Sequence, residues 1–290
     1  MYYRGLLRML VIVVMMVLMV DRSAVGQARQ PDWGFVKFLI DKENYNQALL
    51  LLNKFSTTST SSTDSLNFYL GWTLYNLQDL QRSTEAFRKV SISSSLYIRS
   101  GLFGAWNQAY LKDVKMADQW LSSLNGSITD EMTLVRFETL GIRLLERNFS
   151  GYQKIRSAVS ATHYAWSEAL DKMDTYANQL NTYRPKKTVV SGLLSSVIPG
   201  LGKIYTGQTG SGISAFLMCG VLGAMTVENG IKAGWGHWST LVFGSLFTLF
   251  YAGNIYGSII SAKEVRDYYN EDMDQGILLD MHLPMREFYR

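Results

Sequence analysis

The sequence predicts an all-α protein in which a domain of helical repeats is followed by a two-helix membrane hairpin. Apolar residues recur at helical spacing over residues 31–183, and no stretch keeps the alternation of a strand. The composition changes at Arg184-Pro185, and from there to residue 262 glycine is frequent and charge nearly vanishes. Only 18% of the 290 residues are charged, against roughly a quarter in an average soluble domain, which fits a chain that partly faces lipid.

The start of the chain has the layout of a secretory signal peptide. Two arginines precede an uncharged apolar run over residues 9–20, and small residues follow it. Such a run rises only ~18 Å as a helix, against ~30 Å of hydrocarbon, which disfavours a full span. We therefore expect residues 1–28 to be a signal peptide, cleaved after Gly26 or Ala28, with an uncleaved signal anchor as the alternative.

One small and two large residues recur as a triplet in the region 31–183. The clearest copy is Ser83, Phe87 and Val90. The other copies lie 35 residues earlier (Ala48, Leu52 and Phe55) and 34 residues later (Ala117, Leu121 and Leu124). Gly71 precedes the central copy. The small residues would let two helices approach, and the large ones would fill the space between hairpins.

This pattern resembles the tetratricopeptide repeat (TPR), a helical hairpin of about 34 residues. The resemblance covers residues 33–124, and a fourth unit near Leu140-Gly141 and Leu144 is out of register. It implies a solenoid with a groove for a protein or peptide partner, and its packing residues are Ala48, Leu52, Gly71, Ser83, Phe87, Ala117 and Leu121. A helical spacer without a ligand is the alternative. The aromatics Trp72, Tyr75, Trp106, Tyr110 and Trp120 are expected in the core rather than in a groove.

Two stretches of the domain 184–262 are apolar enough to cross a bilayer, at about 210–229 and 238–262. The short connection between them predicts an antiparallel hairpin, with a buried soluble helix pair as the alternative. Gly220 with Ala224, and Gly253 with Gly257, form small-xxx-small pairs that would let two membrane helices touch.

A glycine-rich motif precedes the hairpin and consists of Pro199, Gly200, Gly202, Tyr205, Gly207 and Gly212. It resembles the motif of TM2-like bacterial membrane proteins, in which two closely spaced membrane helices follow. A lysine inside this motif, Lys203, would cost ~3 kcal/mol at the centre of a span. We therefore expect an interfacial or re-entrant helix that ends near Pro199, followed by a tight turn.

Few residues suggest chemistry. The histidines His163, His237 and His282 lack the spacing of metal ligands, and Cys219 lies within a span. Glu228 and Asn254 are the polar groups in or near the spans, where an ionisable group suggests function, although an interfacial place is favoured for Glu228. We expect no enzymatic activity, cofactor or metal. The net charge of +4 gives no reason to expect nucleic acid.

The last segment, residues 263–290, carries four basic and seven acidic residues, and we expect a solvated acidic tail. The signal peptide would place the repeats in the periplasm and the hairpin in the bacterial inner membrane. The basic residues Arg184, Lys186 and Lys187 flank the hairpin on the supposed outer side and favour the opposite orientation. The sequence thus predicts a membrane-anchored adaptor that binds a protein partner. The alternative is a membrane protein that forms a homo-oligomer through its hairpin and handles a solute or lipid there.

Overall fold

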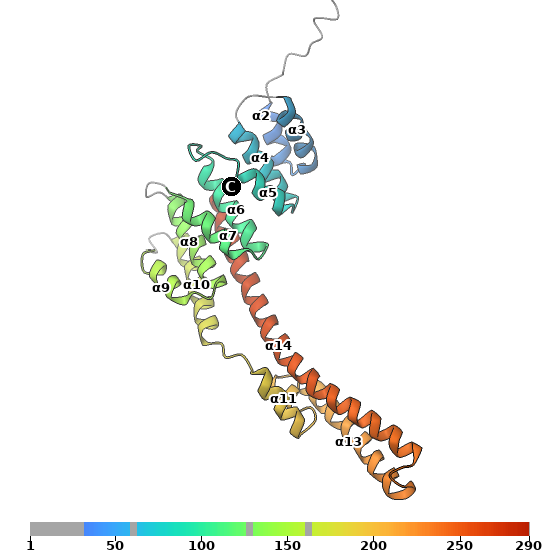
Figure 1. Ribbon diagram of the computed structural model, residues 1–290. Helices are drawn as coiled ribbons and strands as arrows, with labels where there is room; N and C mark the ends of the chain where they lie inside the picture. The colour runs from blue at the N-terminus through green and yellow to red at the C-terminus, as the bar shows by residue number, and fades with distance from the viewer. Residues whose placement is uncertain (1–31, 59–62, 126–129, 160–163, 290) are drawn as a thin grey trace, which may run out of the picture. The chain divides into compact units, whose positions relative to one another are not determined.

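The computed structural model describes residues 32–58, 63–125, 130–159 and 164–289, and every regular element among them is a helix (Figure 1). The predicted all-α class is confirmed. The predicted signal peptide, residues 1–28, lies outside the described residues. The chain divides into two compact units, residues 1–142 and 143–290.

The first unit is built from short helices, each of which packs on the next from α2 to α7 (Figure 1). They are α2 (Trp33–Asp41), α3 (Tyr45–Thr58), α4 (Thr63–Asn76), α5 (Leu80–Phe87), α6 (Tyr97–Tyr110) and α7 (Val114–Ser123). The helix α8 (Asp130–Leu145) begins in this unit and crosses its boundary. Connections of a few residues within each pair make these helices hairpins.

Aromatic rings join the hairpins of this unit. The ring centroids of Trp72 and Phe103 lie 4.9 Å apart, and those of Tyr75 and Phe103 lie 5.2 Å apart, both edge to face. Trp106 packs against Tyr75 and is 7% exposed. Tyr75 and Trp106 therefore belong to the core, as expected, whereas Trp72 and Trp120 are only half-buried and Tyr110 is 49% exposed.

The same turn occurs four times among the described residues. Its central residue has a left-handed backbone, with φ of 57° at Glu43, 63° at Gln78, 67° at Lys112 and 57° at Arg147. Successive turns are separated by 35, 34 and 35 residues. The next residue is always Asn or Asp, and its backbone N–H donates to the carbonyl five residues earlier. In three copies this Asn or Asp caps the following helix by accepting from the backbone N–H three residues on: Asp79 from Arg82, Asp113 from Met116, and Asn148 from Gly151.

The fourth turn changes the interpretation of the region after residue 124. We expected the unit near Leu140-Gly141 and Leu144 to be out of register. The turn that joins α8 to α9 at Arg147-Asn148 instead keeps the spacing of the three earlier turns. The sequence signal is a polar residue, then Asn or Asp, then an apolar residue, and it does not depend on the side-chain triplet.

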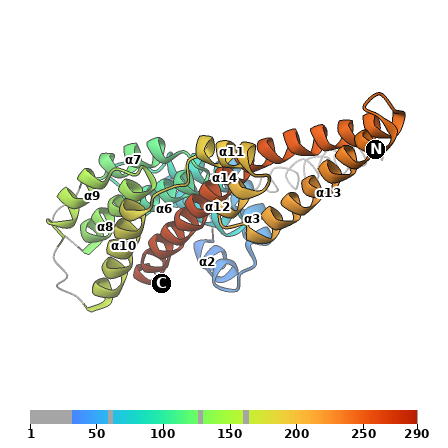
Figure 2. The ribbon, with the colours of Figure 1, turned by 90° about the horizontal axis from the view of Figure 1, so that it is seen from below.

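The second unit begins with the end of α8. It contains α9 (Phe149–Arg156), α10 (Tyr164–Thr182), α11 (Thr188–Val197), α12 (Leu201–Tyr205), α13 (Thr209–Ala233) and α14 (Trp238–Phe288). α13 and the first half of α14 pack side by side as a hairpin (Figures 1 and 2). Both are long and apolar enough to cross a membrane.

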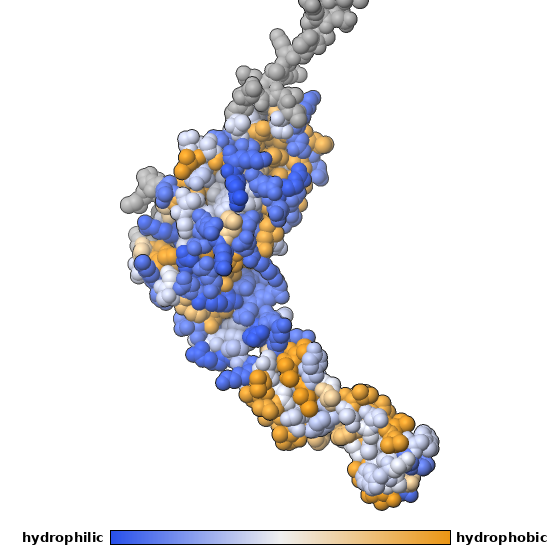
Figure 3. Space-filling model, viewed as in Figure 1, coloured by the Kyte–Doolittle hydropathy of each residue, from blue (hydrophilic) through white to orange (hydrophobic). Residues whose placement is uncertain are grey.

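Apolar side chains gather on the face of this hairpin that Figure 3 shows. Only 17% of the most apolar window of α13 and 11% of that of α14 is buried, whereas the core helix of a soluble protein is mostly buried. This exposed apolar surface fits the expected membrane association.

The predicted solvated tail is wrong for most of its length. α14 has 51 residues and continues past residue 262 to Phe288 without a break. Its second half packs against α10, and Ile277, Met281 and Met285 are 0% exposed. These three residues recur every four positions, so they form one apolar stripe, whereas five of the seven acidic residues of this segment precede Ile277.

Candidate functional site

The glycine-rich motif forms a tight reversal between α11 and α12. Ile198 has an extended backbone, as the residue before a proline requires, so α11 ends at Val197, just before Pro199. Gly200 then has φ +85°, and a Cβ on it would lie 2.0 Å from the carbonyl oxygen of Gly212. Only glycine can occupy this position, because both its backbone conformation and the neighbouring backbone exclude a side chain.

Two further glycines of the motif are also close to other backbone. A Cβ on Gly202 would lie 2.0 Å from the carbonyl oxygen of Ser191 on α11, and one on Gly212 would lie 2.7 Å from that of Gly200. The short α12 is thus held against both α11 and the start of α13.

The remaining motif residues lie at the edge of this arrangement. The ring of Tyr205 lies 4.8 Å from the ammonium of Lys186, and Gly207 forms the next turn with φ +93°. Lys186 belongs to the basic segment before α11, so a cation–π contact ties this segment to α12.

Hydroxyl groups connect α11 and α12 to α14. The Ser191 hydroxyl lies 2.8 Å from the carbonyl oxygen of Ser258 and 3.0 Å from that of Gly202, and its one proton serves both. The hydroxyls of Ser195 and Ser258 are 2.6 Å apart. Thr206 on α12 and Ser261 on α14 form a similar pair at 3.1 Å. Such bonds between helices are typical of packing in membranes, where no water competes for the polar groups.

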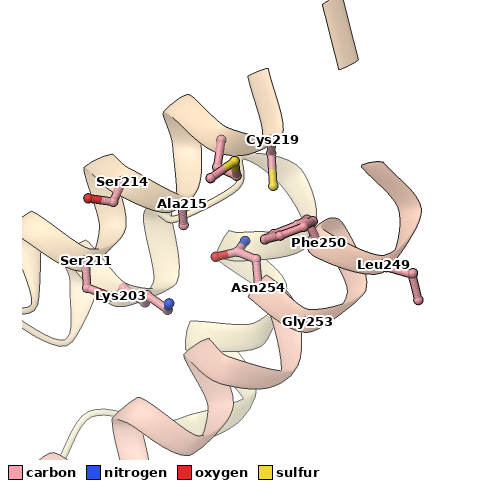
Figure 4. A pocket seen from close by; sticks show the side chains of 10 residues that line it. Lys203, Ser211, Ser214, Ala215, Cys219, Leu249, Phe250, Gly253 and Asn254 are labelled. Carbon is pink, nitrogen blue, oxygen red and sulfur yellow. The ribbon is translucent and has the colours of Figure 1, made fainter. Parts of the chain in front are cut away.

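A cavity of ≈ 580 Å³ lies between α12, α13 and α14 (Figure 4). Its polar lining consists of Lys203, Ser211, Ser214 and Asn254, and its remaining lining is Ala215, Met218, Cys219, Leu249, Phe250 and Gly253. Among these residues none is acidic. The cavity therefore combines one cation with neutral polar groups and an apolar wall.

Asn254 is the most unusual residue of this cavity. Its side chain is 6% exposed, and neither its amide oxygen nor its amide nitrogen has a hydrogen-bond partner among the described residues. Figure 4 shows the amide projecting from α14 toward Ala215 and Cys219 on α13. Buried amides almost always have partners, and an unpaired one costs about 1–3 kcal/mol.

The prediction that the small-xxx-small pairs let α13 and α14 touch is wrong at two of the glycines. A Cβ on Gly220 or on Gly253 would meet no atom within 4 Å, so neither glycine lies against a neighbouring helix. Gly253 lines the cavity instead. At Gly257 the nearest atoms are Cε and Nζ of Lys203, at 3.7 and 3.8 Å, so this glycine makes room for the lysine.

The residues predicted to pack the repeats lie in the core of the first unit. Ala48, Leu52, Ser83, Phe87, Ala117 and Leu121 are each at most 3% exposed. A Cβ on Gly71 would lie 2.6 Å from the ring of Phe87, and the Ser83 hydroxyl donates to the Gly71 carbonyl at 2.8 Å. The Asn107 amide in turn donates to the Ser83 hydroxyl at 3.0 Å. These contacts join α4, α5 and α6.

The other predicted polar groups do not converge on a site. Glu228 forms an ion pair with Lys232, one turn later on α13, and both side chains are more than half exposed. His163 lies outside the described residues. Over the described part of the chain, no group of three His, Cys, Asp or Glu side chains could hold a metal ion. The cavity at Asn254 is therefore the best candidate site, and its groups suit binding.

The sequence identifies Lys203 and Asn254 as polar groups of the membrane region, and the structure places both at one cavity. No protein-family model, no curated protein and no solved structure matches this chain.

Proposed function

We propose that this chain is a membrane-anchored helical-repeat adaptor of the bacterial cell envelope, without enzymatic activity. The observation that carries the proposal is the turn at Glu43, Gln78, Lys112 and Arg147, which recurs every 34 or 35 residues. Helical hairpins at a constant period are the building units of TPR-type solenoids, whose stacked units offer an extended surface to a protein or peptide.

A cavity of ≈ 230 Å³ on α5, α6 and α7 is the candidate contact for this partner. It is lined by Arg88, Tyr97, Met116, Gln119 and Trp120, among others. The Arg88 guanidinium lies 5.6 Å from the centre of the Trp120 ring. Arginine, tryptophan, tyrosine and methionine are the residues enriched in protein interfaces.

The anchor in this proposal is the hairpin of α13 and α14. Two crossings return the chain to the side from which it entered, so α10 and the second half of α14 share one side of the membrane. The contact between these two helices supports this topology. With a signal peptide at residues 1–28, that side is the periplasm.

Site-specific photo-crosslinking in intact cells tests the adaptor. A photoreactive residue at Gln119 of the full chain should give a discrete crosslinked partner, because Gln119 lines the cavity. The same residue at Lys37, exposed on α2 and outside the cavity, is the matched control. Equal products at both positions, or none at Gln119, would refute a partner at this surface.

Protease protection tests the proposed orientation separately. External protease added to spheroplasts should cleave the repeat domain of a chain tagged at its C terminus. Cleavage only after the membrane is broken would place the repeats in the cytosol and reject the periplasmic assignment.

A further inference from the structure

With Trp238 at one membrane surface, as the proposed membrane hairpin requires, the cavity at Asn254 lies toward the opposite surface. Asn254 is 16 residues after Trp238, the first residue of α14. At 1.5 Å per residue it is roughly 24 Å along the helix, in a hydrocarbon layer of about 30 Å. The cavity is thus near the membrane boundary on the side of α11 and α12.

Two of the four polar side chains of the cavity, Lys203 and Asn254, have no partner among the described residues for their strongest interactions. Both amide atoms of Asn254 are buried and unpaired among the described residues. No described carboxylate forms an ion pair with Lys203, whose ammonium lies over Gly257. A cation and an amide donor that face one cavity suit a ligand with negative charge and several acceptor oxygens.

The apolar wall extends from these groups toward the middle of the hairpin. Leu249, Phe250 and Met218 line the cavity and are 68%, 48% and 48% exposed, so the cavity is open to the side where acyl chains would lie. Leu249 and Phe250 are nearer to Trp238 than Asn254 is, and therefore deeper in the bilayer. A ligand with an anionic head and an apolar tail fits both ends of the cavity.

We propose that this cavity binds the phosphate group of an anionic lipid, with Lys203 and the Asn254 amide donating to phosphate oxygens and the acyl chain along Met218 and Phe250. The Asn254 carbonyl oxygen is left to accept from the P–OH group of a singly ionised phosphate. Gly253 and Gly257 serve this site by leaving room for the ligand and for the lysine stem. This lipid site is independent of the adaptor role of the repeats.

Binding to the purified full chain in an uncharged detergent tests the proposal. The probes are dioctanoyl phosphatidic acid, inorganic phosphate and dioctanoylglycerol, measured by isothermal titration calorimetry. Saturable binding is expected for phosphatidic acid alone. Equal affinity for inorganic phosphate would make the site a free-anion site, and equal affinity for dioctanoylglycerol would show that the phosphate is not recognised; either result overturns the proposal.

Matched variants then assign the binding to this cavity. Lys203→Gln and Asn254→Leu should each weaken phosphatidic acid binding by roughly tenfold or more, while Lys203→Arg keeps most of it. Gly253→Leu should block the cavity, because its side chain would enter open space. Lys263→Gln and Gly220→Leu, which change an exposed lysine and an open glycine outside the cavity, should bind as the wild type does.

Two results would overturn the assignment of residues. One is unchanged phosphatidic acid binding in both Lys203→Gln and Gly253→Leu, with helix content intact by circular dichroism. The other is a change of oligomeric state in Asn254→Leu, by size-exclusion light scattering, with phosphatidic acid binding kept. In that case Asn254 pairs with a second copy of the chain.

Discussion

The phenol of Tyr176 on α10 donates a hydrogen bond of 2.7 Å to Oδ2 of Asp280 on α14, 104 residues later in the chain. Lys172, one turn earlier on α10, pairs with the other carboxylate oxygen at 3.3 Å. Tyr176 fits because Gly276 has no side chain, since a Cβ there would lie 2.7 Å from the phenol oxygen. These contacts hold the second half of α14, which follows the hairpin, against α10, which lies earlier in the chain.

Removing the phenol should weaken this fastening. In Tyr176→Phe the Asp280 carboxylate keeps Lys172 but loses one hydrogen bond, so the free energy of unfolding should fall by about 1 kcal/mol. Denaturant unfolding of the full chain in detergent measures it. Tyr268→Phe on α14 is the control, because Tyr268 is 75% exposed. Equal losses in both variants would contradict the role of Tyr176.

The hydrogen bond from Tyr176 to Asp280 should be lost at high pH, when the phenol ionises. Burial, with the hydrogen bond to Asp280 and its negative charge, raises the pKa of Tyr176 from 10 to about 12. Since the folded pKa lies above the unfolded one, the contribution of Tyr176 to stability is complete below pH 10 and is lost as pH rises toward 12. The difference in unfolding free energy between wild type and Tyr176→Phe should therefore shrink over this interval. A difference that already shrinks at neutral pH would show that another group is responsible.

Replacing a left-handed turn residue with glycine tests whether its backbone conformation costs stability. Gln78 has φ 63°, which costs an L-residue roughly 1 kcal/mol and costs glycine little. Gln78→Gly should therefore leave the stability of the repeat domain unchanged or raise it by about 0.5–1 kcal/mol. Gln81→Gly, three residues later on the exposed side of α5, should instead lower stability by about 1 kcal/mol. Thermal unfolding of both variants decides whether the turn is as described.

These turns also show how much of the first unit could be predicted from sequence. The small-large-large triplets identify helix packing up to residue 124, because packing depends on side-chain volume. The fourth turn is not predicted from the triplets, because α9 lacks the triplet and only the Arg147-Asn148 signal of the connection is present. A search for the connection rather than for the triplet would have found all four turns.

The second unit was harder to predict for a different reason. The length of the apolar runs is enough to identify α13 and the start of α14. After Lys263 the acidic residues make the segment look solvated, and its stripe of three buried residues can be recognised only once α10 is known to pack against it. Likewise, Lys203 and Asn254 are 51 residues apart and become neighbours only through the reversal at Gly200. Sequence reasoning could identify each group but not their approach, which depends on tertiary packing.

The contact of Gly71 with Phe87 should be sensitive to a single methyl group. Gly71→Ala places a Cβ 2.6 Å from the Phe87 ring inside the core, and overpacking of this kind costs about 1–3 kcal/mol. Phe87→Leu creates space at the same point. In a double-mutant cycle the two changes together should cost at least about 1 kcal/mol less than their sum, measured by denaturant unfolding. Strict additivity would mean that the two residues are not in contact.

Three glycines around the membrane motif should respond to alanine in a fixed order. Gly200→Ala should be the most damaging, because the new Cβ would lie 2.0 Å from a backbone oxygen that cannot move aside. Gly207→Ala has the same kind of positive φ but open space around it, so it should cost only about 1 kcal/mol of conformational strain. Gly210→Ala lies in α13 with open space and no positive φ, and should be neutral or stabilise by up to about 1 kcal/mol. Thermal unfolding of the three full-length variants in detergent gives the order, and equal effects at Gly200 and Gly207 would mean that the approach of Gly200 to Gly212 does not constrain the fold.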